Sequence, residues 1–496
     1  MKFCALTSLV SVLLASPDKT MAASHDHEDE CTHGKLYVVD NETALVHVFD
    51  ISEGNLQNLT VETTIQLPTE GAGGLVYYGP PSDPLVVQYR GTEADGFDGF
   101  VRVINTGFSL DNHGDHAHIE YSPPSIYDNA NVDDCSRPIH QVRHDDKIAI
   151  FCDGAYDFEP PINTTIHVID ETKLGSTTES AVVHTLELEG SHHGVAIPVD
   201  DGHLMHSVPL PDRVNRVPDT SSTPTTFLVV DYEGKVLHEL SDETNLATHC
   251  SGFHGSAAIE NQFALGCDDD HGAIVLVNYN PATETYTSSA VTYPDDAKFE
   301  NMRVGSFAYH YKQDHFVGSF GVRGGTQYHL LAITPSSTAI TDDNVLTLPG
   351  TLRQCAYEFE VGSGEHLLVF MPDGVLHVFK VEGGKFQAIM NKEIVPGMSA
   401  CSEAAFVAGI QQAFVATPET RTMYAIDLEH VDEGEMEVYT STLPFFPTGM
   451  TVSGFSLEAA CHEHEHAEPP TPADGAHAHI VPVMGFLVMV AGFFFV

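Results

Sequence analysis

The feature that most constrains the fold is an internal repeat that runs through most of the 496 residues. Each unit contains a short strand, a polar turn and a second strand, usually followed by a third and a fourth strand. The units recur roughly every 40 to 65 residues, as the four-stranded blades of a propeller do. The segments that open the seven units start near Gly74 (GGLVYYG), His140, His193, His254, Gly305, Cys355 and Cys401.

The two ends of the repeat region complement each other. The segment KLYVVDNETALVHVFD supplies outer strands without an inner one, whereas Thr448 to Phe455 supplies an inner strand alone. Joined, they form a closing blade. We therefore predict an all-β chain with a single propeller over residues 35–455, most simply with eight four-stranded blades. Seven blades remain the alternative, because unit boundaries are the least secure part of such a prediction. A β-sandwich would not require this periodicity.

Both termini have the composition of targeting segments. Residues 1–23 have the layout of a secretory signal, with Lys2 before an apolar stretch and small residues at its end. Residues 480–496 are apolar and uncharged, about long enough to span a bilayer. Because small and polar residues precede this run, it resembles the signal for a lipid anchor, with a plain tail anchor as the alternative.

These segments predict a secretory-pathway protein at the cell surface or outside the cell, held at the membrane by the tail or a lipid. In a bacterium the compartment would be the periplasm. Three glycosylation sequons fit a eukaryotic secretory route but add little weight, since the motif is short. They are Asn41, Asn58 and Asn163.

The charge balance excludes one class of partner. The chain has 70 Asp and Glu against 21 Lys and Arg, for a net charge of −49. Binding to nucleic acid requires clustered Lys and Arg, so no nucleic-acid partner is expected. An acidic surface attracts cations, although salt tolerance would explain it equally well.

Nine cysteines are present, and eight remain after loss of the signal, as an oxidising compartment favours. Two pairs have the same spacing of 17 residues and bracket neighbouring strands, which predicts disulfides Cys135–Cys152 and Cys250–Cys267. We pair the remaining cysteines less firmly as Cys355–Cys401 and Cys31–Cys461, the latter tying the ends of the ring together. Zinc-thiolate binding is the alternative, but no CxxC spacing occurs.

Three consecutive units place histidine at the start of the inner strand: His140, His193 and His254. The inner strands of a propeller line its axis, so these imidazoles should converge and form a Zn²⁺ site with an open fourth position. A single such histidine would more often cap a strand or bond a carbonyl group. Three in one register favour the metal site. Imidazole also suits copper and nickel.

Histidine and acidic residues are also mixed in three segments that we expect to be flexible: residues 24–34, the stretch DNHGDHAH and residues 456–479. In the second stretch, His113, His116 and His118 are candidate zinc ligands. Tracts of this kind capture metal weakly and exchange it quickly, because nothing preorganises their ligands. The alternative is a solvated polar linker.

Several motifs resemble the periplasmic zinc metallochaperones of the AztD type, which deliver zinc to the solute-binding protein of an ABC importer. The likeness covers roughly residues 35–455 and is carried by GFVRVINTGFSLDNHGDHAHIE, SRPIHQVRHDDKIAIFCDG, GSHHGVAIPVDDGHLMHSVPLPD and HCSGFHGSAAIENQFALGCDD. The resemblance implies a propeller, a buried site that matches His140, His193 and His254, and a mobile His/Asp segment. The C-terminal His-rich region and apolar tail of this chain depart from the family pattern.

These observations favour an extracytoplasmic zinc carrier without enzymatic activity. The resemblance implies a zinc importer or its solute-binding protein as partner. A zinc-dependent hydrolase or lyase is the main alternative, since three histidines and an open position can activate water. No nucleophile motif or phosphate-binding loop supports it, and no general base can be placed beside the site from sequence. A propeller used only for protein interactions is a third hypothesis.

Overall fold

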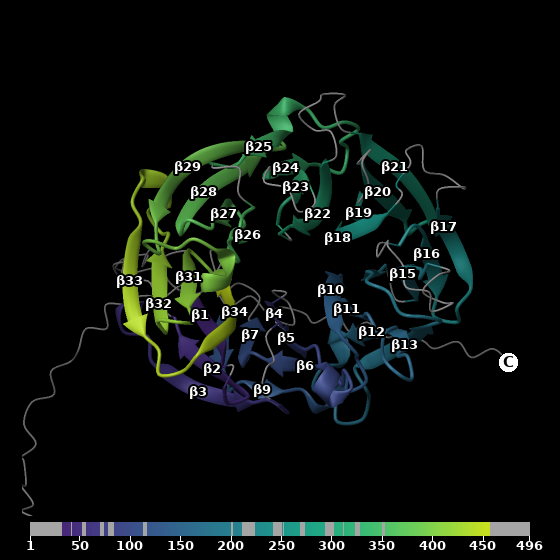
Figure 1. Cartoon of the computed structure of the whole chain (residues 1–496), viewed down its shortest axis with the longest axis horizontal. Coiled ribbons are helices and arrows are strands. Elements are labelled where there is room, and N and C mark those ends of the chain that lie inside the picture. The colour runs from purple at the N-terminus through teal and green to yellow at the C-terminus, as the bar shows by residue number, and fades with distance from the viewer. Residues whose placement is uncertain are drawn as a thin grey trace, which may run out of the picture.

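A computed structural model of the chain shows a ring of eight four-stranded antiparallel sheets (Figure 1). The structure describes residues 32–40, 42–51, 56–69, 74–77, 84–112, 117–199, 202–210, 224–241, 250, 252–267, 273–292, 302–310, 312–322, 328–349 and 353–456. The predicted eight-bladed propeller is confirmed, as is the composite closing blade. The predicted signal segment, the segment 457–479 and the apolar tail lie outside the described residues. Within the described part, no helix is long and apolar enough to cross a bilayer.

The blades follow one another along the chain, and the strands of each blade run in order from the axis to the rim of the ring. The first four blades are β34 (Pro447–Ser456), β1 (Thr32–Asp40), β2 (Leu45–Asp50), β3 (Val61–Gln66); β4 (Gly74–Tyr77), β5 (Pro84–Tyr89), β6 (Phe100–Asn105), β9 (Ser125–Ile126); β10 (Pro138–His144), β11 (Lys147–Cys152), β12 (Thr164–Asp170), β13 (Val182–Leu188); and β14 (Ala196–Pro198), β15 (His203–Ser207), β16 (Phe227–Asp231), β17 (Val236–Leu240).

The other four blades have the same topology. They are β18 (Phe253–Ile259), β19 (Gln262–Cys267), β20 (Ala273–Asn280), β21 (Thr285–Thr292); β22 (Met302–Ala308), β23 (Phe316–Val322), β24 (Tyr328–Ile333), β25 (Val345–Thr347); β26 (Ala356–Phe359), β27 (His366–Phe370), β28 (Val375–Glu382), β29 (Lys385–Glu393); and β30 (Ala405–Ala408), β31 (Gln412–Thr417), β32 (Thr422–Asp427), β33 (Glu437–Thr442).

The remaining elements lie in the connections between strands. A two-stranded hairpin of β7 (Phe108–Asn112) and β8 (Ala117–Tyr121) is inserted before the last strand of the second blade. The short 3₁₀ helices are η1 (Leu56–Asn58), η2 (Glu93–Asp95), η3 (Asp128–Ala130), η4 (Glu171–Lys173), η6 (Asp342–Asn344), η8 (Cys401–Glu403) and η9 (Val431–Glu433).

The core lies between the blades. Eight clusters of buried apolar side chains among the described residues lie between neighbouring sheets. The second strand of a blade is covered on both faces, so β11 (KIAIFC) and β27 (HLLVF) are buried throughout. The outer strand β21 alternates between exposed and half-buried side chains over most of its length, as a strand at the rim of the ring does. Burial thus decreases from the second strand of a blade to its outer strand, and this repeated pattern explains why the units can be recognised in the sequence.

The first and last strands close the ring. β1 pairs antiparallel with β34, with Leu36 opposite Val452, and β34 in turn packs against β4 of the second blade. The closing blade therefore joins two chain segments that lie at opposite ends of the sequence.

Three disulfides among the described residues cross-link strands within a blade or between neighbouring blades. Cys135–Cys152 and Cys250–Cys267 each connect the residues before an inner strand to the end of the second strand, and Cys355–Cys401 connects two neighbouring blades. The Cα–Cα distances are 5.2, 5.4 and 4.9 Å. These three predicted pairings are confirmed. Cys31 and Cys461 lie outside the described residues.

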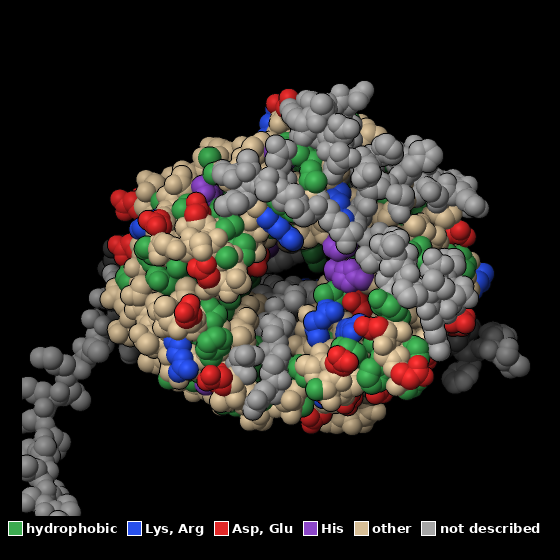
Figure 2. Space-filling view, viewed as in Figure 1, with side chains coloured by type: hydrophobic (Ala, Val, Ile, Leu, Met, Phe, Trp, Pro, Cys, Tyr) green, Lys and Arg blue, Asp and Glu red, His purple; other side chains and the backbone are tan. Residues whose placement is uncertain are grey.

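The inner strands of six blades surround a cavity of about 920 Å³ along the axis. Figure 2 shows the opening at the centre of the ring. The lining includes Gln141, directly after His140, and Ser256, two residues after His254. It also includes Glu358, whose Oε2 accepts a hydrogen bond of 2.9 Å from the Ala408 backbone N–H. Burial raises the pKa of Glu358 to about 7, and that single hydrogen bond offsets only part of the shift.

The substitution Glu358→Gln is expected to stabilise the protein at alkaline pH. A carboxyl whose folded pKa lies above its unfolded value holds its proton longer in the folded state, so ionisation costs stability as pH rises from about 4.5 to 7. Because water in the cavity reduces the cost, we expect a gain of about 2 kcal/mol at pH 8 and almost none at pH 4.5. Urea unfolding at both pH values measures the difference.

The exposed residue Glu382 supplies the control for this experiment. Glu382→Gln should leave the stability unchanged at both pH values. An equal gain for Glu358→Gln at pH 4.5 and pH 8 would contradict the argument, because it would indicate better packing rather than removal of a buried charge.

Candidate metal centre

The three histidines predicted as ligands come together at the axis of the ring. One ring nitrogen of each of His140, His193 and His254 lies within 4.8 Å of the others. The Nε2 atoms of His140 and His193 are 3.3 Å apart, and the ring centroids of His193 and His254 are 5.2 Å apart. Figure 2 shows a group of histidine side chains at the rim of the central opening. The convergence expected from the repeat is therefore present in the structure.

The local backbone places each imidazole differently. His140 lies in β10 and His254 in β18, each at an irregularity of the strand pairing. Such bulges redirect a side chain. His193 lies three residues before β14 rather than within it, so the expectation that all three occupy equivalent strand positions is only approximate. The convergence arises from bulges and a loop as well as from register.

Two glycines make room beside these histidines. Gly255 has φ of +79°, and a Cβ atom there would lie 2.9 Å from the carbonyl oxygen of Gly305. That close approach lets His254 Nδ1 donate to the same carbonyl at 2.7 Å. A Cβ atom at Gly194 would lie 2.1 Å from Ser207 Oγ. A larger residue at position 255 would therefore displace the backbone beside His254, and one at position 194 would collide with the side chains packed beside His193.

Hydrogen bonds to Nδ1 orient two of the rings. His193 Nδ1 lies 3.2 Å from Asp153 Oδ2, and His254 Nδ1 lies 2.7 Å from the Gly305 carbonyl oxygen. When Nδ1 donates to such a group, Nε2 keeps the lone pair that a metal ion would take. Arg90 Nη2 lies 3.6 Å from Asp153 Oδ2, and Nη1 of Arg90 donates to the Pro138 carbonyl oxygen at 3.1 Å. This arrangement resembles the carboxylate–histidine pairs found behind zinc ions.

The environment keeps His140 neutral. Its pKa is lowered to about 3, first by burial of the ring and then by the neighbouring His193 and His254. The residue as a whole is half-buried. Since a neutral imidazole is the form that binds metal, protons compete little for this ligand near neutral pH.

The donor set fits a zinc ion. Three imidazole nitrogens are a common catalytic or exchangeable zinc set, and they leave the fourth position open. Asp153 Oδ1 is buried beside the site, and within the described part of the chain it has no hydrogen-bond partner. A polar atom in this state is costly unless a bound water or ion satisfies it. Three ligand nitrogens and one unpartnered carboxylate oxygen beside them are compatible with a cation at this place.

The predicted His/Asp segment falls mostly outside the described residues. His118 lies in β8, whereas His113 and His116 belong to the residues that connect β7 to β8 and are not described. The contribution of this segment to a metal site stays a prediction.

Sequence reasoning did not identify the residues that support the histidines. Asp153 directly follows the disulfide-bonded Cys152, and Arg90 follows β5 of the preceding blade. In the sequence, Asp153 has a counterpart: Asp268 follows Cys267 at the end of β19, as Asp153 follows Cys152 at the end of β11. This repeat was an available signal that the sequence analysis did not use, and no motif that it used marked Arg90.

Other proteins resemble the chain in sequence and in fold. No family model matches it. It is 25% identical over 360 residues to the zinc chaperone AztD of Citrobacter koseri, an alignment that covers 72% of both proteins. The apo structure of AztD from Citrobacter koseri superposes with a TM-score of 0.64 at 19% identity, covering 85% of this chain and 98% of that one. A second crystal structure of the same AztD gives 0.63, with the same identity and coverage. The resemblance to AztD-type proteins is thereby confirmed: the chain is similar to AztD in sequence and shares its propeller fold.

Proposed function

We propose that this chain is a zinc carrier that acts outside the cytoplasm. It binds one Zn²⁺ tightly through His140, His193 and His254, and passes the ion to another protein. The observation that carries the proposal is the convergence of three imidazoles, two of them oriented through Nδ1, at the axis of the ring. The similarity to a protein named zinc chaperone supports it.

The site can bind zinc and still release it. His193 is partly accessible, with 32% of its side chain exposed, so an acceptor ligand can approach. With an open fourth position, an incoming ligand binds before a histidine leaves, and the ion is never stripped bare. Asp153 and the Gly305 carbonyl hold the two oriented rings during this exchange. Protein partners of this chemistry are a zinc importer or its solute-binding protein.

The proposed compartment is the secretory pathway and the cell surface, with attachment through the C-terminal tail or a lipid. Three disulfides within the described residues support it, since they persist in oxidising surroundings. The predicted signal segment and tail give the route and the anchor.

A metal analysis tests the proposed function directly. Protein purified without added metal should contain one tightly bound zinc per chain, which a strong chelator removes and which apo acceptor protein takes up. Zinc that stays bound in the presence of the chelator and in the presence of the acceptor protein would contradict a carrier and favour a structural ion. A chain that binds zinc no more tightly than its His140→Ala variant would overturn the site itself.

We propose further that the segment from His113 to His118 accelerates transfer. Replacing His113, His116 and His118 by alanine should slow zinc release to a competing chelator several-fold, while the dissociation constant moves less. A tract predicted to be mobile can offer a ligand to the leaving ion and so affects the rate of release. The axial histidines hold the bound ion and so determine its affinity. Stopped-flow transfer beside equilibrium titration separates rate from affinity.

Two outcomes of that experiment have a definite meaning. An unchanged rate of zinc release would mean that the segment from His113 to His118 is an ordinary connection between strands. Loss of the tight site would identify one of its histidines as the fourth ligand. Replacing His329 in β24 by alanine provides a control, because that histidine belongs to none of the three predicted metal-exchanging segments.

A zinc-dependent hydrolase is the second candidate, favoured by one observation. Asp153 lies behind His193, and its Oδ1 has no partner among the described residues, so it could accept a proton from zinc-bound water only through an intervening water. Hydrolysis of an activated ester by the zinc-loaded protein, abolished by Asp153→Asn while zinc remains bound, would support this activity. Equal rates with and without zinc would dismiss it.

A further inference from the structure

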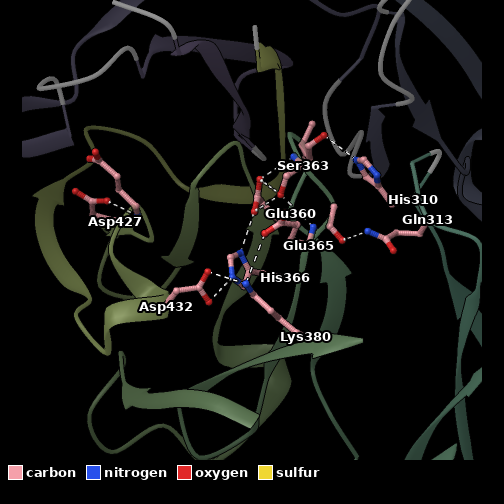
Figure 3. A network of polar contacts seen from close by, with 12 residues as sticks. His310, Gln313, Glu360, Ser363, Glu365, His366, Lys380, Asp427 and Asp432 are labelled. Atoms are coloured by element: carbon pink, nitrogen blue, oxygen red, sulfur yellow. Dashed lines mark hydrogen bonds and ion pairs between the residues drawn. The ribbon is translucent and has the colours of Figure 1, made fainter. Parts of the chain in front are cut away.

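A second group of potential metal ligands lies on another part of the ring. Glu365, His366 and Asp432 each offer a ligand atom within 4.8 Å of the others. Figure 3 shows them within a network of polar contacts that includes Glu360 and Lys380. The group belongs to the blades β26–β29 and β30–β33, which Figure 1 places across the ring from β10 and β18.

The fold brings these residues together from two blades. Glu365 immediately precedes β27, and His366 is the first residue of that strand. His366 pairs across the sheet with Lys380 of β28. Asp432 comes from η9 in the next blade and reaches His366, with Oδ1 3.2 Å from Nε2. The cluster therefore lies at the junction of two blades.

A buried carboxylate orients His366. Glu360, 2% exposed, lies with Oε2 3.2 Å from His366 Nδ1. Glu360 is itself fixed, because the Ser363 backbone N–H donates to its Oε1 at 2.9 Å. This is the same relation that Asp153 has to His193. It turns Nε2 toward the exposed carboxylates Glu365 and Asp432, as the carboxylate behind a zinc-bound histidine does.

The charge of the cluster favours a divalent cation. Glu360, Glu365 and Asp432 contribute three negative charges. Lys380 supplies one positive charge, with Nζ 2.7 Å from Asp432 Oδ2 and 3.6 Å from Glu365 Oε2. Burial lowers the pKa of His366, but its hydrogen bonds to Glu360 and Asp432 raise the pKa overall, so an ion would have to displace a proton from the ring. With the imidazole in its neutral, metal-binding form the group carries a net charge of −2, which one divalent ion would cancel.

We propose that Glu365, His366 and Asp432 form a second zinc site, separate from the axial histidines and exposed to solvent. One imidazole nitrogen and two carboxylate oxygens are a ligand set that zinc accepts, with water completing the coordination. Glu360 positions His366 without touching the metal. Lys380 competes with the ion for the two carboxylates, so the site is weaker than the axial one. Bound zinc would join the two blades.

The test uses a triple variant of the full chain in which His140, His193 and His254 are all alanine, so that the axial ligands are absent. Zinc binding is measured in this background. Equilibrium dialysis should then show a zinc equivalent that Asp432→Asn or His366→Gln weakens at least about tenfold. Glu360→Gln should weaken it by about 10- to 100-fold, as the loss of such an orienting partner does. Lys380→Met should tighten it. Asp427→Asn, in β32 of the same blade as Asp432, is the matched control and should change nothing.

The Lys380 variant distinguishes a metal site from a network of ion pairs. If the cluster only stabilises the fold, Lys380→Met lowers the melting temperature and leaves zinc affinity unchanged, which overturns the proposal. Equal zinc affinity in Asp432→Asn and the parent also overturns it, and this variant should fold normally because Asp432 is 47% exposed. Since the axial ligands are absent throughout, the result does not depend on whether the chain is a zinc carrier.

Discussion

Replacing His193 by alanine is expected to weaken the tightest zinc equivalent at least about 100-fold. Loss of a partner that merely orients a zinc ligand typically costs 10- to 100-fold in affinity, so loss of the ligand itself should cost no less. His140→Ala and His254→Ala should have similar effects, because one ring nitrogen of each histidine lies within 4.8 Å of the others and we propose that all three bind one ion. Competition titration with a chelator of known affinity measures the change.

Two further variants make this result diagnostic. Asp153→Asn keeps His193 as a ligand but weakens the orientation of its ring. Its zinc affinity should therefore lie between that of the parent and that of His193→Ala. His203→Ala removes a histidine of the neighbouring strand β15, whose Nδ1 contacts Tyr286 Oη, and should leave affinity unchanged. If all three axial variants retain the tight equivalent, these histidines are structural and the axial site does not exist.

The second large effect concerns the disulfide Cys250–Cys267. Replacing both cysteines by serine is expected to lower the free energy of unfolding by about 3 kcal/mol, mainly by relaxing the unfolded chain. The bond also fixes the start of β18, where His254 lies. Zinc affinity should therefore fall together with stability. Denaturant unfolding of the metal-free protein and zinc titration give the two values.

The disulfide Cys355–Cys401 serves as the control for that experiment. It closes a loop of 46 residues in blades that carry no axial histidine, so its removal should cost similar stability without changing affinity at the axial site. Free thiols at Cys250 and Cys267 in the mature protein, found by peptide mapping under non-reducing conditions, would contradict the pairing.

The fold could be predicted because each blade repeats the same pattern of burial. A fully buried second strand, such as β31, gives an apolar run wherever a blade occurs, and polar turns separate the runs. The closing blade was predictable for the same reason, since β1 lacked an inner partner and β34 lacked outer ones. The disulfides at a spacing of 17 residues followed from the same strand pairs.

The site could be predicted only in part. His140 and His254 occupy inner strands, so the repeat identified them, and His193 was close enough to join them. Asp153 and Arg90 come from connections whose length differs between blades. The second cluster joins His366 to Asp432, 66 residues away in a loop of another blade, and no periodic pattern connects the two. Such contacts depend on how blades pack, which the strand pattern does not specify.

The pairing of β1 with β34 has a consequence for how the chain folds during synthesis. Tyr37 and Ser453, which share a hydrogen bond across this blade, are 416 residues apart. A chain made from its N-terminus therefore holds the inner edge of β1 unpaired until nearly all of the propeller has been translated. An open strand edge invites pairing with other chains, and closing so long a loop is entropically costly. The three axial histidines lie in consecutive blades and come together earlier, so a nascent chain could meet zinc before its ring is closed.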